Sequence, residues 1–81
     1  MKIIIDIREP YEYRVGHIDG AINITKDLLE LVPEKYLNKN NLYVLYCDKG
    51  IYSLELSNKL NKKGYRTISL EGGYLKYKNS V

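Results

Sequence analysis

The fold of this chain is decided by the stretch Leu42-Tyr43-Val44-Leu45-Tyr46-Cys47-Asp48-Lys49-Gly50-Ile51-Tyr52-Ser53. Its first five residues are an apolar run of β-formers, which predicts a buried strand. The run delivers the only cysteine of the chain, Cys47, into a short loop before a helix. Backbone N–H groups and the helix dipole favour an anion where a helix begins, so a thiolate at this junction is stabilised and reactive. Cys47 is therefore the candidate nucleophile.

The helix after this loop is the best specified of the chain. Leu56, Ser57 and Leu60 recur at helical spacing and predict a face toward the core, while Gly64 predicts the C-terminal stop. Ser53 suits the start of this helix, either as its cap or as a residue of its first turn.

Strands and helices alternate along the rest of the chain. Apolar, β-branched segments predict strands over residues 3–7, 21–24 and 65–70, and helices are expected over residues 9–14, 26–32 and 74–77. In the second of these helices, Leu28, Leu31 and Val32 are spaced to share one apolar face, and Thr25 suits the cap. Such alternation predicts an α/β fold with a small central parallel sheet and helices on its faces. Ligands collect at the carboxyl ends of strands in such sheets, and Cys47 lies at such an end.

Three further residues are candidates for supporting roles. Asp6 stands near the end of the first strand, and Arg8 is the nearest cation. A structural salt bridge between them is favoured over a direct catalytic role, because ion pairs at strand ends are commonly structural. The only histidine, His17, lies in the turn 16–20 and could act as a general base for Cys47. Because its neighbours are turn residues, we favour a structural histidine whose ring hydrogen-bonds the loop.

Size and composition limit the possible classes of protein. With 81 residues the chain is one domain, 1–81, and a hydrophobic content of 44% with 28% charged residues is ordinary for a folded globular protein. No apolar run approaches the roughly 18 residues of a membrane span. The N-terminal run meets Asp6 too early for a secretory signal, so the expected location is the cytoplasm.

Cysteine count and charge restrict the partners. One cysteine cannot form an internal disulfide. The single cysteine and the single histidine belong to no cluster with the spacing of metal ligands, so we expect neither a metal site nor a cofactor. The net charge of +3 is modest and scattered, which argues against nucleic acid as a partner. Nine tyrosines could stack on bases, but ordinary packing is the favoured interpretation of these side chains.

Several motifs taken together resemble a known family. The chain is similar to a single-domain rhodanese in its segments Asp6-Ile7-Arg8-Glu9, Gly16-His17-Ile18-Asp19-Gly20-Ala21-Ile22-Asn23-Ile24, Tyr46-Cys47-Asp48-Lys49-Gly50 with Ser53, and Leu70-Glu71-Gly72-Gly73-Tyr74. The resemblance implies a rhodanese-like α/β fold with helices on both faces of the sheet. It also implies a sulfurtransferase in which Cys47 accepts a sulfane sulfur from a donor such as thiosulfate. The resulting persulfide passes the sulfur to a thiol or to a cyanide-type acceptor.

On this resemblance, the loop after Cys47 is the substrate-binding part of the site. Its backbone would cradle both the thiolate and the anionic outer sulfur of a persulfide without a general base. Gly50 is needed where the loop turns closely around that anion. His17 then holds only its own turn. The residues implied are Asp48, Lys49, Gly50, Ile51, Tyr52 and Ser53.

The loop also departs from the pattern of the family. Tyr52 stands where rhodaneses commonly carry arginine, and Asp48 stands at a position that is sometimes basic, so Lys49 is the only cation of the loop. A carboxylate at the rim repels dianionic thiosulfate by about 1 kcal/mol at about 4 Å in water. A persulfide on a partner protein or on a small thiol suffers less from that charge.

The beginning of the chain departs from the family as well. The sequence starts at a strand that family members usually reach only after an extra element. This short form is expected to leave one edge or face of the sheet thinly covered, as a site for a partner or for self-association.

Two other functions remain as alternatives. A phosphatase or arsenate reductase on this scaffold needs a C-x5-R loop, and Ser53 stands where the arginine would be. A non-catalytic or regulatory rhodanese-like binding module is the stronger alternative, motivated by the missing first element and by Asp48 and Tyr52. Because Cys47 is present, the binding module ranks below the sulfurtransferase.

Overall fold

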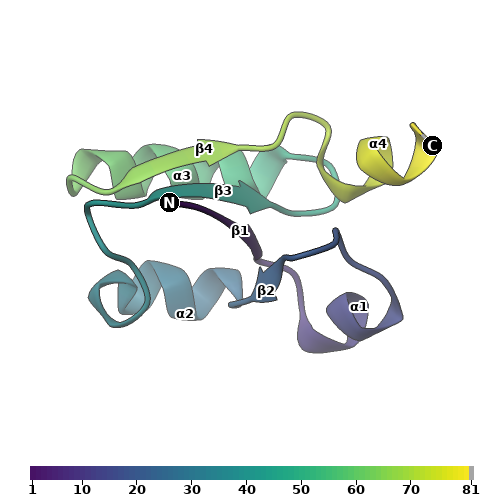
Figure 1. The fold of residues 1–81 in the computed structure, drawn as a ribbon, viewed down its shortest axis with the longest axis horizontal. Helices are drawn as coiled ribbons and strands as arrows, with labels where there is room; N and C mark the ends of the chain where they lie inside the picture. Colours follow the sequence, from purple (N-terminus) through teal and green to yellow (C-terminus); the bar gives the residue numbers. More distant parts are fainter. Residues whose placement is uncertain (81) are drawn as a thin grey trace.

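The structure, a computed structural model, describes residues 1–80. Four strands and four α-helices alternate along the chain, with a short 3₁₀ turn, η1, before the third strand (Figure 1). In chain order they are β1 (Lys2–Asp6), α1 (Pro10–Val15), β2 (Ile22–Asn23), α2 (Lys26–Leu31), η1 (Pro33–Lys35), β3 (Leu42–Tyr46), α3 (Ile51–Lys62), β4 (Arg66–Ser69) and α4 (Gly73–Asn79). All pairings between strands are parallel, in the order β2-β1-β3-β4. The predicted α/β fold is therefore confirmed.

The order of the strands places helices on both faces of the sheet. The chain moves from β1 to β2 on one side and then returns past β1 to β3 and β4 on the other. Crossovers between parallel strands are right-handed, so α1 lies on one face and α2 and α3 on the opposite face. Helix α4 joins the face of α1, because the ring of Tyr74 packs against the buried Ile18, Ala21 and Tyr46.

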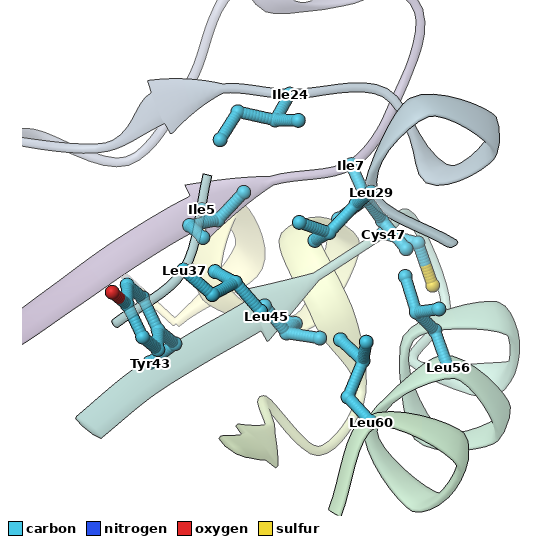
Figure 2. Packing of buried hydrophobic residues seen from close by; sticks show 10 residues of the cluster. All are labelled: Ile5, Ile7, Ile24, Leu29, Leu37, Tyr43, Leu45, Cys47, Leu56 and Leu60. Atoms are coloured by element: carbon cyan, nitrogen blue, oxygen red, sulfur yellow. The ribbon is translucent and has the colours of Figure 1, made fainter. Parts of the chain in front are cut away.

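The main core lies between the sheet and the pair α2 and α3 (Figure 2). Alternate residues of adjacent strands, such as Ile5 and Leu45, meet the predicted stripe of α3, in which Leu56 and Leu60 are almost fully buried. The stripe on α3 is thus confirmed. The buried residues of this core are Ile5, Ile7, Ile24, Leu29, Leu37, Tyr43, Leu45, Cys47, Leu56 and Leu60.

The opposite face of the sheet is covered less completely. Ile4, Val44 and Ile68 are paired across three strands on this face. Val44 is buried, whereas Ile68 remains 51% exposed. Packing on this side gathers at the carboxyl ends of the strands, beneath α1 and α4.

The predicted apolar face of α2 was wrong. Its buried residue is Leu29, whereas Leu28 and Leu31 are 46% and 76% exposed. A helix of six residues makes fewer than two turns, so three apolar positions do not fix its rotation about its axis. The helix ends at Leu31 because Val32 precedes Pro33, and a residue before proline disfavours the helical conformation.

The ends of the other elements differ by a few residues from those predicted. Thr25 is the N-cap of α2 by its backbone, without a side-chain hydrogen bond. Gly50, not Ser53, is the N-cap of α3, so Ser53 belongs to the first turn of that helix. The last helix begins earlier and runs further than predicted, over Gly73–Asn79. Within residues 1–80, no helix has the length and hydropathy that crossing a membrane requires.

Candidate active site

Cys47 lies at the switch point of the sheet. The neighbouring strands β1 and β3 end together, with Asp6 paired to Tyr46. The segment after β1 leads to α1 on one face of the sheet, and the segment after β3 leads through Cys47 to α3 on the opposite face. A crevice forms outside the strand ends where two connections diverge in this way. The geometry therefore places Cys47 where the strand pattern predicted a ligand site.

The sulfur of Cys47 lies among hydrogen-bond donors. The backbone N–H groups of Gly50 and Ser53 donate to Sγ at 3.2 and 3.4 Å, and Ser53 Oγ lies 3.4 Å from Sγ. Figure 2 shows the side chain at the end of the core, with its sulfur directed toward α3. Only 5% of Cys47 is exposed. Such a cradle stabilises a negative charge on sulfur, because each donor strengthens its hydrogen bond when the acceptor becomes an anion.

Gly50 makes this loop geometry possible. Its φ of 89° lies in the left-handed region, which residues with a side chain rarely adopt. A Cβ at this position would lie 3.0 Å from the backbone nitrogen of Gly72 and 3.2 Å from the carbonyl oxygen of Leu70. The tight turn predicted at Gly50 is thus present.

A cleft of about 550 Å³ opens over Cys47. Several loop residues line it, among them the exposed Lys49, Ile51 and Tyr52. Lys26 of α2 also lines it, with Nζ 6.0 Å from the centre of the Tyr52 ring. The lining residues are Ile7, Arg8, Glu9, Glu12, Lys26, Asp27, Cys47, Asp48, Lys49, Ile51 and Tyr52.

The first turn of α4 holds the loop from behind. The backbone N–H groups of Tyr74 and Leu75 donate to the carbonyl oxygens of Cys47 and Asp48, at 2.8 and 3.0 Å. A Cβ on Gly73 would overlap both of these carbonyls, so only glycine allows this close approach. In the sequence, Gly72-Gly73 lies between the predicted strand over residues 65–70 and the predicted helix over residues 74–77, and nothing in it indicates that this segment docks on the loop.

Asp6 and Arg8 form a buried ion pair beside the cleft. Arg8 Nε and Nη2 donate to the Asp6 carboxylate, with the shortest distance 2.8 Å, and Nη2 also donates to the Gly16 carbonyl at 2.7 Å. Tyr46 Oη donates to Asp6 at 2.8 Å. This geometry agrees with the structural interpretation of the pair.

Burial and the charges of this network shift the pKa values of two of its members, Arg8 and Tyr46. Burial alone would lower the pKa of Arg8, but the hydrogen bonds and the charge of Asp6, with the charge of Asp48, raise it above its ordinary value. Burial raises the pKa of the Tyr46 phenol above its ordinary value. The hydrogen bond that Tyr46 donates to Asp6 acts in the same direction.

Arg8 also reaches the active-site loop, which the sequence-based reasoning missed. Its Nη1 lies 3.2 Å from Asp48 Oδ1, so the carboxylate at the rim is paired and is not a free charge. The pairing register of β1 and β3 explains this contact. Because Asp6 pairs with Tyr46 in parallel strands, the residues two positions further, Arg8 and Asp48, face each other beyond the strand ends.

His17 lies outside the cleft. Its ring stacks on Tyr13 with 3.8 Å between ring centres, and its Nδ1 lies 2.8 Å from the Tyr13 carbonyl oxygen. In the described part of the chain these are its polar and stacking contacts, and it is not among the lining residues of the cleft. The geometry favours the structural role of His17 over that of a general base for Cys47. Residues 1–80 hold no group of three His, Cys, Asp or Glu side chains arranged for a metal ion.

Comparison with known protein families gives one matching model, that of the rhodanese-like domain, over residues 1–80. The chain is 32% identical to the putative sulfurtransferase YtwF of Bacillus subtilis, over 96% of its own length and 75% of that protein. It is 38% identical to a tRNA sulfurtransferase of Desulfurococcus amylolyticus and 30% identical to a tRNA uridine(34) hydroxylase of Buchnera aphidicola. It spans only 15% and 26% of the length of these two proteins.

Solved structures agree with the family match. A rhodanese-related protein from Thermoplasma volcanium superposes with a TM-score of 0.88 at 28% identity, covering 98% of this chain and 78% of that one. The reduced CoADR-RHD protein of Bacillus anthracis superposes with a TM-score of 0.85 at 30% identity, covering 94% of this chain but only 14% of that protein.

Proposed function

Because the chain belongs to the rhodanese-like domain family, we propose that it is a sulfurtransferase that carries a sulfane sulfur as a persulfide on Cys47. One observation carries the proposal. The sulfur of Cys47 lies at a cleft and receives hydrogen bonds from the N–H groups of Gly50 and Ser53. Relatives named as sulfurtransferases support transfer at the level of the family.

The cradle supplies what this reaction needs. The Cys47 thiolate attacks the outer sulfur of the donor, a new S–S bond forms, and the bond inside the donor breaks, so that the leaving group departs with the electron pair. In the second half, a thiolate or cyanide attacks the outer sulfur of the Cys47 persulfide and releases Cys47 as a thiolate. The negative charge lies on the Cys47 sulfur before the first half and after the second, and on the outer sulfur of the persulfide between them. Fixed N–H donors of the loop would stabilise each of these anions, so no general base is required.

The charges of the cleft favour a persulfide over thiosulfate as the donor. Four carboxylates and three cations line it, so it offers no net positive potential to a small dianion. A volume of about 550 Å³ accommodates the persulfide of a small thiol or a cysteine on a partner protein. The same cleft would admit a thiol acceptor. We place the reaction in the cytoplasm, where thiols are kept reduced.

A regulatory binding module is the second candidate function. It is favoured by the thinly covered face of the sheet, where Ile68 is half exposed. Such a face would take a protein partner or a second copy of the chain. In this case Cys47 would not turn over sulfur.

Intact-mass measurement separates the two. Reduced protein is incubated with thiosulfate and, separately, with glutathione persulfide. We expect a gain of one sulfur atom with the persulfide, which cyanide or excess thiol removes and which Cys47→Ser does not show. No gain with either donor would contradict sulfur transfer and favour the binding module.

A further inference from the structure

We infer that the ion pair between Asp48 and Arg8 selects the sulfur donor, because Asp48 occupies the guanidinium that would otherwise bind an anionic donor beside Cys47. This inference rests on the proposed function and narrows its donors. On this inference, Asp48 keeps small dianions such as thiosulfate from binding beside Cys47. The sulfur donors that can react are then persulfides of thiols.

Arg8 is the anchored cation of the cleft. Its Nε and Nη2 are bound to Asp6 and to the Gly16 carbonyl, and its guanidinium carbon lies 4.3 Å from the centre of the Tyr74 ring. The side chain is 7% exposed, so it cannot swing toward an arriving ligand. Of its three nitrogens, Nη1 is the one that contacts the loop, and Asp48 binds it at 3.2 Å.

The other two cations that line the cleft are held less firmly. Lys26 lies 3.5 Å from Glu30 in a partly exposed pair, and Lys49 is an exposed side chain of the loop. Exposed lysines hold anions weakly, because water screens the charge and ordering the side chain costs entropy. A buried guanidinium in a fixed position binds oxyanions far better. Thiosulfate would therefore need Arg8, and Asp48 already occupies it.

Asp48 is itself fixed in this position. It follows Cys47 directly, and its carbonyl accepts the N–H of Leu75 at 3.0 Å. Its side chain is 44% exposed and lines the same cleft as Cys47. The carboxylate would lose its ion pair if it moved away from Arg8. In its place beside Cys47, it meets any donor that approaches the sulfur.

The chemistry of the two donors explains the selection. When the Cys47 thiolate attacks the outer sulfur of thiosulfate, the S–S bond breaks and sulfite leaves with the electron pair as a dianion. That charge needs a cation in contact with it. When the donor is a thiol persulfide, the same attack releases a thiolate with a single charge on sulfur. The reaction with a thiol persulfide therefore releases no sulfite dianion that Arg8 would have to bind, and the Asp48–Arg8 pair does not hinder it.

The test is the ratio of loading rates from thiosulfate and from glutathione persulfide, measured by intact mass. Asp48→Asn keeps the shape of the side chain, removes its charge and ends the ion pair at Arg8 Nη1, while Arg8 Nε and Nη2 stay bound to Asp6. This ratio should therefore rise about tenfold. Asp27→Asn is the matched control, because Asp27 lines the same cleft and has no ion pair within residues 1–80. Its ratio should rise about twofold, through net charge alone.

Equal ratios in the two variants, or no rise in Asp48→Asn, would overturn the inference. A second measurement does not depend on turnover. Sulfate should protect Cys47 of Asp48→Asn from alkylation by iodoacetamide and should not protect the parent protein or Asp27→Asn. If no donor loads any of these proteins but sulfate protects only Asp48→Asn, the proposed function fails and the anion site at Arg8 stands.

Discussion

The hydroxyl oxygens of Ser53 and Ser69 lie 2.6 Å apart, and Ser53 Oγ lies 3.4 Å from the sulfur of Cys47. As a thiol, Cys47 donates its S–H to Ser53 Oγ. Once the sulfur is a thiolate, Ser53 donates its one proton to sulfur and can accept from Ser69. When the sulfur is an anion, both hydroxyls point their protons toward it, and each hydrogen bond in such a chain strengthens the next. Ser69, on β4, therefore orients the donor that Ser53 presents to the sulfur.

Removing these hydroxyls should slow the chemistry of Cys47. Ser53→Ala deletes a hydrogen bond to a charged acceptor, which contributes about 1.5–3 kcal/mol. We expect alkylation by iodoacetamide at pH 7 to slow about tenfold, and the persulfide to be lost faster to thiol. Ser69→Ala leaves the Ser53 donor in place and should slow alkylation only about twofold, whereas Ser69→Thr should restore the rate.

A second hydroxyl pair on the same helix and strand provides the control. Ser57 Oγ lies 2.7 Å from Thr67 Oγ1, one turn further along α3, and has no contact with the sulfur. Ser57→Ala should lower the free energy of unfolding in urea by about as much as Ser69→Ala does, but should leave the rate of alkylation unchanged. If Ser57→Ala slows alkylation as much as Ser69→Ala does, then Ser69 acts only by placing α3.

Gly73 should be indispensable for the shape of the active-site loop. Gly73→Ala forces a Cβ into the carbonyls of Cys47 and Asp48, at a φ of 61°. The strain at such a φ costs about 1 kcal/mol for an ordinary residue, and the backbone overlap adds to it. We expect a loss of about 2–4 kcal/mol in urea unfolding, and slower alkylation because the loop must move.

Gly20→Ala separates strain from overlap. Gly20 has a φ of 84°, but a Cβ there would meet nothing within 4 Å. This variant should lose only about 1 kcal/mol and keep its alkylation rate. Equal losses in the two variants would show that the contact between α4 and the loop adds nothing to stability.

Residue spacing predicted those parts of the molecule that depend on nearby residues. The twelve residues of α3 complete three turns, so the spacing of Leu56 and Leu60 identified its buried face. Cys47 could be placed at a junction because the apolar run before it ends sharply. The six residues of α2 were too few to choose between Leu28 and Leu29, and there packing against the sheet decided.

The parts that were missed depend on residues far apart in the chain. Arg8 and Asp48 are 40 residues apart and meet only because β1 and β3 pair in one register. Local patterns do not contain this register. The docking of α4 on the loop likewise needs a backbone approach that only Gly73 allows, and a pair of glycines by itself indicates no more than a turn.

The buried phenol of Tyr46 should make the fold sensitive to alkaline pH. Burial raises its pKa in the folded protein above the ordinary value, and it donates a hydrogen bond to Asp6 at 2.8 Å. Above pH of about 10 the unfolded chain releases this proton while the folded protein keeps it. The unfolded state then binds fewer protons, so the free energy of unfolding falls with pH, by about 1.4 kcal/mol per pH unit from this group alone.

Tyr46→Phe should remove this part of the pH dependence. The ring stays packed while the titrating group is gone, so the variant is less stable at pH 8, because Asp6 loses a donor. Its stability should nevertheless decline less steeply than that of the parent between pH 10 and pH of about 12. Urea unfolding at several pH values measures both slopes, with Tyr77→Phe, an exposed tyrosine on α4, as the control that should keep the parent slope. A Tyr46→Phe protein with the parent slope would mean that Tyr46 ionises as readily in the folded state as in the unfolded state.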